Sequence, residues 1–204
     1  MPRITAEAKT QARRRLLEAG AEHFARDGLE RASVDAIAVG AGYAKGTFYN
    51  YFDSKGALFG EVIAEGARRA VARYAEVEEH GSVRERLTAL AAADVTVLRE
   101  EEAFIKVVVR EAMSFRAETY PVVVQHLAPY LSKVESVLSD GIAAGEIRSD
   151  RPSVQLALMF VGTLTLLYVQ HWGSGGAWPS LDDVPDLAVG AFLDGAAVRK
   201  GDTA

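Results

Sequence analysis

Cysteine is absent from the 204-residue sequence, so disulfide bridges, thiolate metal sites and cysteine nucleophiles are excluded. The four histidines, at positions 23, 80, 126 and 171, have no second histidine at the spacing of a metal site. A nucleophile elbow, a phosphate loop and a paired-carboxylate signature are also missing. We therefore expect no catalytic site, no cofactor and no metal.

Positive charge is scarce as well, because the formal net charge is −5. The sequence nevertheless has a basic end: residues 1–60 carry a net charge of +2, whereas residues 61–204 carry −7. Residues 1–15 hold one acid, Glu7, and five bases: Arg3, Lys9, Arg13, Arg14 and Arg15. This distribution predicts that the basic end meets a polyanion, with an ordinary solvated helix terminus as the alternative. The polar, basic start is unlike a secretory signal, and we expect a cytoplasmic protein.

Long alternation of polar and apolar residues is largely lacking, whereas apolar residues recur at helical spacing along most of the chain. Gly28 is expected to end a first helix over residues 10–26 in the left-handed conformation. Two short helices follow, one capped by Ser33 and ended by Gly42, and one that ends at Phe52. Longer helices are predicted over 55–79, with Asp53 or Ser54 as cap, and over 83–99, 101–117, 122–144, 153–172 and 184–199. The expected fold class is all-α.

One stretch permits a different interpretation. Residues 33–39, "SVDAIAV", also suit a buried strand, and Gly40, Gly42 and Gly46 follow at a spacing close to a dinucleotide-binding turn. That motif needs a repeating βαβ unit, for which the downstream sequence supplies no further strands. A nucleotide-dependent oxidoreductase that uses this glycine loop is the alternative function.

The helical interpretation of the same stretch explains more residues. Two short helices that meet at a tight turn need a small residue where they cross and a glycine at the turn, which Ala38 and Gly42 supply. Residues 44–51 would then be the recognition helix of a helix-turn-helix, which enters the DNA major groove. Its Lys45 can reach a guanine edge, and its tyrosine hydroxyls can contact phosphates. Phe48 and Phe52 are expected to close the core.

The residues of this predicted helix-turn-helix, together with the segments on either side, resemble a known protein family. The segment "KGTFYNYFDSK", preceded by "LLEAGAEHFARDGLERAS", resembles the DNA-binding head of the tetracycline-repressor family over about residues 13–59. The resemblance implies a three-helix DNA-binding head at residues 1–55 and an all-helical ligand-binding and dimerisation domain at residues 56–204. It also implies a homodimer that represses transcription from double-stranded operator DNA until a small-molecule effector binds. The DNA-facing positions that it implies are Ser33, Val34, Lys45, Gly46, Thr47, Tyr49, Asn50 and Tyr51, with Lys55 on a phosphate.

Two positions depart from the family pattern. Ala32 replaces a frequent threonine, so the phosphate contact expected there is lost. Ala44 replaces a frequent serine that would cap the recognition helix, and a missing cap costs roughly 0.5–2 kcal/mol of local stability.

Residues 153–172 are apolar on nearly every side, which is typical of a helix that is buried all round or spans a membrane. A membrane-anchored helical protein is therefore a further alternative. The resemblance implies instead that this helix packs on a partner subunit together with residues 184–199, so that two helices from each subunit form a four-helix interface. The last helix has a suitable stripe in Leu187, Ala191, Phe192, Gly195 and Val198.

The effector is expected to be small and largely apolar, because most ligand sites combine apolar walls with a few polar groups. Residues 104–115 and 168–172 are expected to form walls of its pocket, together with a small residue at Gly162. The candidate ligand contacts are Arg110, Met113, Phe115, Tyr130, Tyr168, His171 and Trp172.

Overall fold

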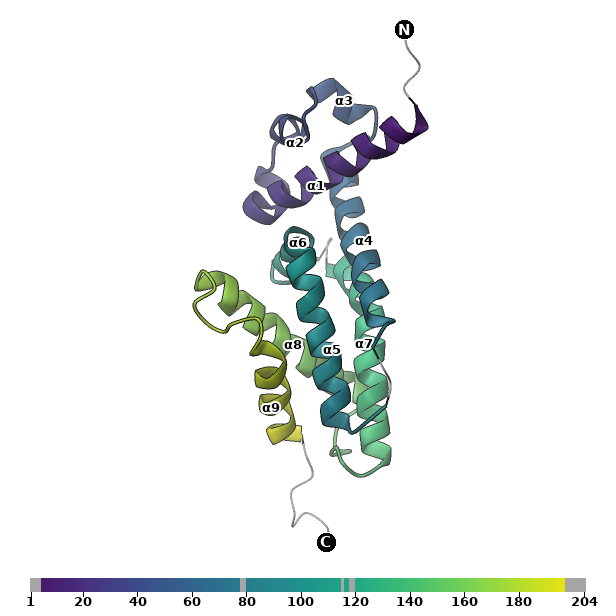
Figure 1. Ribbon diagram of the computed structural model, residues 1–204, viewed down its shortest axis with the longest axis vertical. Helices are drawn as coiled ribbons and strands as arrows, with labels where there is room; N and C mark the ends of the chain where they lie inside the picture. The colour runs from purple at the N-terminus through teal and green to yellow at the C-terminus, as the bar shows by residue number, and fades with distance from the viewer. Residues whose placement is uncertain (1–4, 78–79, 115, 118–119, 197–204) are drawn as a thin grey trace. The chain divides into compact units, whose positions relative to one another are not determined.

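The computed structural model describes residues 5–77, 80–114, 116–117 and 120–196, and it omits the side chains of residues 122, 126 and 196. These residues form helices and no strand of a sheet (Figure 1). The helices are α1 (Ala6–Arg31), α2 (Val34–Gly40), α3 (Lys45–Tyr49), α4 (Lys55–Tyr74), α5 (Val83–Glu100), α6 (Glu102–Ala112), α7 (Tyr120–Ala143), α8 (Ser153–Gly173) and α9 (Val184–Ala196). The all-α prediction is confirmed.

The segment with two interpretations is helical. Residues 34–40 form α2, so the strand that a dinucleotide-binding turn requires is not formed there. The strand interpretation, and with it the basis for an oxidoreductase, is therefore wrong. The reason is tertiary: Ile37 and Ala38 are fully buried on one helical face, where a strand would place them on opposite faces.

The helix boundaries follow local chemistry. Gly28 has a φ of 76° and a ψ of 169°, a positive-φ conformation that favours glycine but differs from the left-handed helical cap expected there, and the helix continues beyond it to Arg31. Ser54 caps α4, since its Oγ accepts a hydrogen bond from the Ala57 amide at 3.0 Å. Ser33 occupies the N-cap position of α2 without a side-chain capping bond.

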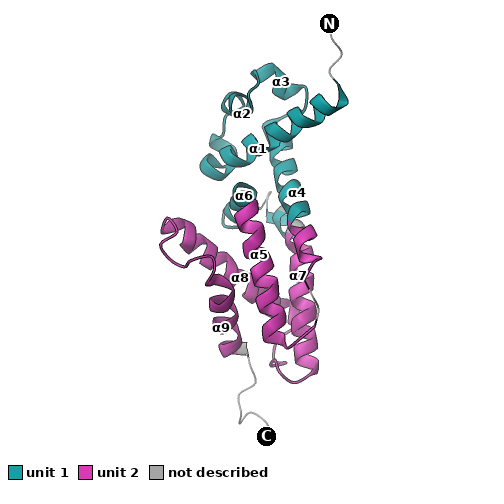
Figure 2. Cartoon of the chain, in the orientation of Figure 1, with its two compact units in different colours: residues 1–69, 101–126 teal, residues 70–100, 127–204 magenta. Residues whose placement is uncertain are grey.

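The chain forms two compact units, which Figure 2 distinguishes by colour. Unit 1 comprises residues 1–69 and 101–126, and unit 2 comprises residues 70–100 and 127–204. Unit 1 thus reaches beyond the predicted head of residues 1–55, because α6 packs along α1 and Phe59 of α4 meets Phe24 of α1 edge-on at 5.2 Å.

The core of unit 1 holds the first helices at fixed angles. A Cβ added at Gly20 would lie 2.8 Å from Leu58 Cδ2, so glycine lets α1 and α4 approach closely. Leu16, Phe24, Ile37 and Phe48 are fully buried around this crossing. Complete burial of large apolar side chains is the main stabilising term for so small a group of helices.

Unit 2 is built on helices α5, α8 and α9, with most of α7 and the end of α4. Helix α9 packs on both α5 and α8, and Phe192 of α9 meets Phe160 of α8 edge-on at 5.4 Å. Leu87, Ala91 and Leu98 are buried along one stripe of α5. The sequence-predicted helices of this region therefore form one packed core.

Candidate functional site

The turn between α2 and α3 has the geometry that the sequence predicts. Gly42 has a φ of 82°, which L-residues with a side chain rarely adopt, and its amide donates to the Val39 carbonyl at 2.9 Å. The Tyr43 amide donates to the Ala38 carbonyl at 2.8 Å, which closes the corner. Ala38 and Ala41 are buried inside it. The result is a rigid corner that fixes the direction of α3.

Helix α3 has a buried side and an exposed side. Phe48 is completely buried and Phe52 nearly so, which confirms their assignment to the core. Tyr49, the residue next to Phe48, is 51% exposed. Of the other residues expected to face DNA, Ser33, Lys45, Gly46 and Asn50 are exposed, whereas Val34, Thr47, Tyr51 and Lys55 are partly buried.

Lys45 is already paired. Its Nζ donates to Asp35 Oδ2 of α2 at 3.0 Å, and this bond raises the pKa of Lys45. Both side chains are more than half exposed, so the pair is screened by water and weak. Lys45 can exchange Asp35 for a DNA group at little cost. Sequence reasoning missed Asp35 as a neighbour of the DNA-facing surface.

Lys55 has backbone partners that the sequence does not predict. Its Nζ donates to the carbonyl oxygens of Glu30 at 2.8 Å and Ala32 at 3.0 Å. Both acceptors belong to the segment that joins α1 to α2. Lys55 thus holds that segment against the start of α4, and its expected phosphate contact stays a prediction.

Two of the predicted effector residues lie in unit 1. Arg110 of α6 donates from Nη1 to the carbonyl oxygens of Ala25 at 3.2 Å and Arg26 at 3.3 Å in α1, so it joins two helices. Met113, just after α6, is 43% exposed. Phe115 lies outside the described residues.

The other predicted effector residues lie in unit 2, where the structure adds two that sequence reasoning missed. Tyr130 and Tyr168 are buried, and Trp172 lies 6.2 Å from Tyr168 between ring centroids. The added residues are Asp94 of α5 and Tyr74 of α4. Tyr168 Oη donates to Asp94 Oδ2 at 2.6 Å, and Tyr74 Oη donates to Oδ1 at 2.5 Å.

The helical spacing of α5 could have identified Asp94 from the sequence. It falls on the same stripe of α5 as the buried Leu87, Ala91 and Leu98, where an apolar residue is the norm. A lone acid on such a stripe marks a buried polar group that needs partners. His171, in contrast, is occupied locally, since its Nδ1 lies 2.9 Å from the Pro179 carbonyl oxygen.

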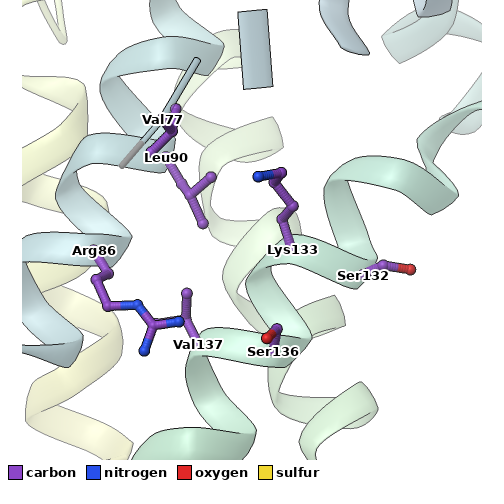
Figure 3. A pocket seen from close by; sticks show the side chains of 7 residues that line it. All are labelled: Val77, Arg86, Leu90, Ser132, Lys133, Ser136 and Val137. Atoms are coloured by element: carbon purple, nitrogen blue, oxygen red, sulfur yellow. The ribbon is translucent and has the colours of Figure 1, made fainter. Parts of the chain in front are cut away.

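A separate cavity of about 160 Å³ opens in unit 2 (Figure 3). Arg86 of α5 and Lys133 of α7 extend toward it from opposite sides. Arg86 is already paired with Asp140, whose Oδ2 accepts from Nη1 at 2.8 Å. None of the predicted effector residues is among the lining residues, which are Val77, Arg86, Leu90, Ser132, Lys133, Ser136 and Val137.

Helix α8 presents an apolar face outward. Leu158, Met159 and Leu166 are each at least half exposed, an unusual state for large apolar residues. Gly162, four residues after Leu158 and four before Leu166, is exposed on this face, and a Cβ added there would meet nothing within 4 Å. Its expected role as a wall of the effector pocket stays a prediction.

Helix α9 continues this outward face in part. Leu187 is 40% exposed, and Ala191 and Gly195 are also exposed. Phe192 departs from the predicted stripe because it is buried against α8, and Val198 lies outside the described residues. By length and composition Ser153–Gly173 is also apolar enough to cross a membrane, a test that core helices of soluble proteins pass as well.

A buried corner between two short helices, the second of which exposes its polar side, defines the helix-turn-helix class of DNA-binding proteins. Comparison with known families gives the particular family. Residues 16–62 match the model for bacterial regulatory proteins of the tetR family, and residues 80–195 match the tetracyclin repressor-like C-terminal domain. The chain belongs to the tetR family, whose members are DNA-binding transcriptional regulators.

Individual relatives are similar along most of the chain. The transcriptional repressor KstR2 of Rhodococcus jostii is 28% identical over 209 residues, which covers 96% of each chain. The fatty acid metabolism regulator protein of Bacillus subtilis is 25% identical over 150 residues, 73% of this chain and 77% of its own.

Solved structures share the fold. The transcriptional regulator FadR from Bacillus subtilis, solved in complex with stearoyl-CoA, has a TM-score of 0.74 at 21% identity and covers 89% of this chain and 98% of its own. A Saccharomonospora viridis protein solved in complex with choline has a TM-score of 0.72 at 22% identity, over 93% of this chain and 100% of its own.

Proposed function

We propose that the protein is a cytoplasmic, homodimeric repressor that leaves its operator when a small, largely apolar effector binds. The observation that carries the proposal is the corner at Gly42, which fixes the exposed α3 on a buried base. This geometry suits insertion of α3 into a major groove. The similarity to named repressors along nearly the whole chain supports repression.

The effector is proposed to bind in unit 2, beside Tyr130, Tyr168 and Trp172. Aromatic side chains there surround one carboxylate, which is the usual composition of a ligand site: apolar walls with few polar groups. Structures of the same fold contain ligands as different as stearoyl-CoA and choline. The fold therefore accommodates ligands, and the identity of the effector depends on the side chains.

The dimer is proposed to form through the outward faces of α8 and α9. Exposed large apolar side chains gathered on one helix face are typical of a protein interface. The glycines at 162, 190 and 195 leave open space around their backbone, which allows a second copy to approach closely. A membrane would also cover such a face, so the oligomeric state in solution decides between them.

Selection of bound sequences from random DNA tests the DNA-binding part. We expect enriched sequences with two half-sites whose centres are about one DNA turn, roughly 34 Å, apart. A single unpaired half-site would contradict the dimer, and no enrichment would contradict the function. The enriched sequence is then the operator for tests of the effector.

Calorimetry tests the regulatory part. A compound that binds the free protein and causes release is expected to bind the operator complex more weakly, with a coupling of about 1–3 kcal/mol. Equal affinity for free and operator-bound protein would contradict effector-driven release, because coupling between two ligands is reciprocal.

Sedimentation velocity tests the dimer. Gly162→Trp places a bulky side chain on the outward face of α8 and should shift the protein toward monomer. Ala89→Trp is the control, since Ala89 is exposed on α5 and should leave the dimer intact. A dimer that persists in Gly162→Trp, or a native protein that partitions into the membrane fraction, would contradict this interface.

A further inference from the structure

Four helices bring polar groups to one point inside unit 2. Asp94 of α5 lies deep in the unit and accepts hydrogen bonds from Tyr74 of α4 and Tyr168 of α8, one on each carboxylate oxygen. Tyr130 of α7 stacks at 4.5 Å on Tyr74, and its hydroxyl lies 3.4 Å from the Leu90 carbonyl oxygen. The carboxylate is therefore oriented from two sides.

Among the described side chains, no lysine, arginine or histidine forms an ion pair with Asp94, and only the hydroxyls of Tyr74 and Tyr168 favour its charged form. Burial raises the pKa of Asp94 despite those hydroxyls. Removing a carboxylate from water costs several kcal/mol, and buried charges in proteins are ordinarily paired. A cation bound beside Asp94 would supply the countercharge that these residues lack.

The surroundings suit a cation. Tyr74 and Tyr168 contact the carboxylate through their hydroxyls. Each has a further aromatic neighbour: Tyr130 lies 4.5 Å from Tyr74 and Trp172 lies 6.2 Å from Tyr168 between ring centroids. The two hydroxyl groups that touch Asp94 donate to it and so orient the carboxylate, but they carry no positive charge of their own. Aromatic faces attract ammonium groups, particularly when both are removed from water. Asp94 also keeps part of its surface accessible, although it lies deep in the unit.

We propose that Asp94 anchors the effector and that the effector carries a positively charged nitrogen, as a protonated amine or a quaternary ammonium group. This inference rests on the proposed effector site in unit 2 and specifies its chemistry. The apolar remainder of the effector lies against the rings, and the nitrogen supplies the missing countercharge. A ligand of the same shape without the charge leaves the cost of the buried carboxylate uncompensated.

The experiment compares four hexyl compounds on the full chain by calorimetry in the absence of DNA. Hexylamine and hexyltrimethylammonium carry a positive charge, hexanol is neutral and hexanoate is negative. We expect at least one of the two cations to bind about tenfold or more tightly than hexanol, the effect of one close charge pair. Hexanoate should bind most weakly. The two cations differ in hydrogen-bond donation, so their order separates a protonated amine from a quaternary ammonium group.

The variant Asp94→Asn removes the charge and keeps the size. It should reduce binding of the preferred cation about tenfold or more and leave hexanol unchanged. Asp186→Asn, which removes an exposed charge from α9 of the same unit, should change neither. If Asp94→Asn does not fold, the four-compound series on the native protein still decides, because it needs no variant.

Two outcomes would overturn the inference: hexanol or hexanoate bound as tightly as both cations, or no measurable binding of any cation. An equal loss of cation binding in Asp186→Asn would also overturn it, by assigning the preference to general charge. None of these outcomes involves DNA. Operator binding and its release are measured separately, so the inference can fail while the proposed repressor function holds.

Discussion

Two charged residues stand at the centres of the two sites, and their surroundings are opposite. Lys45 of unit 1 is more than half exposed and has a partner in Asp35, whereas Asp94 of unit 2 lies deep among four helices and has no cationic partner among the described residues. In water an ion pair is weak and its members exchange partners easily. In the interior a single unpaired charge is costly. We therefore expect substitutions of exposed charged residues such as Lys45 to change DNA binding with little effect on stability. Substitutions of enclosed residues such as Asp94 should change the stability of the fold.

The largest expected effect compares adjacent residues on α3. Phe48→Ala removes a completely buried ring and should destabilise unit 1 by about 3–5 kcal/mol. Tyr49→Ala removes a half-exposed ring and should weaken DNA binding with little change in stability. Thermal unfolding and operator titration measure the two quantities. Equal loss of stability in both variants would show that Tyr49 belongs to the core after all.

A second comparison uses the two lysines of the same region. Lys55→Met removes the donor to two backbone carbonyls and should reduce stability by about 1 kcal/mol, because the bond to Ala32 is part-buried whereas water can replace the exposed bond to Glu30. Lys45→Met should leave the melting temperature unchanged and alter base preference in a sequence-selection experiment. If Lys55→Met kept its stability and weakened binding equally on all sequences, Lys55 would be the phosphate contact that the family resemblance implies.

The pH dependence of stability tests the enclosed carboxylate. Burial raises the folded-state pKa of Asp94 above its ordinary value, so folding favours the protonated acid. The native protein should therefore lose stability relative to Asp94→Asn as pH rises above about 4, by at most about 1.4 kcal/mol per pH unit. The described titratable groups near Asp94 are Tyr74, Tyr130 and Tyr168, and burial raises the pKa of all three, so none of them titrates in this range.

Denaturant unfolding of the two proteins between pH 4 and pH 8 gives the difference directly. If the free energy of unfolding changed with pH in the same way for the native protein and Asp94→Asn, the pKa of Asp94 would be the same in the folded and unfolded states. That result would remove the argument that its charge is costly in the free protein.

The two regions also differ in how far the sequence predicts them. The corner at Gly42 depends on neighbours: the left-handed glycine, the small Ala38 and the ring of Phe48 lie within a short stretch, and local pattern identifies them. The cluster at Asp94 joins residues 20 and 74 positions apart, and no periodicity specifies which residues of separate helices meet. The contact between Lys55 and Glu30 could not be predicted for the same reason, since the two residues are 25 positions apart.

The smallest expected effect concerns the Asp35–Lys45 pair on the exposed surface. Asp35→Asn frees Lys45 and removes a negative charge from the surface expected to face DNA. Affinity should rise a few-fold for operator and non-operator DNA alike, so that the ratio between them falls or stays unchanged. The gain should fade with added salt, because an exposed charge is screened over a Debye length of about 10 Å at 0.1 M. The gain can arise because Lys45 is freed or because Asp35 no longer repels the phosphates, and a double-mutant cycle with Lys45→Met separates these two causes. If the gain came from freeing Lys45 it would vanish in the Lys45→Met background, whereas a gain of the same size there would show that Asp35 acts by repelling phosphates alone.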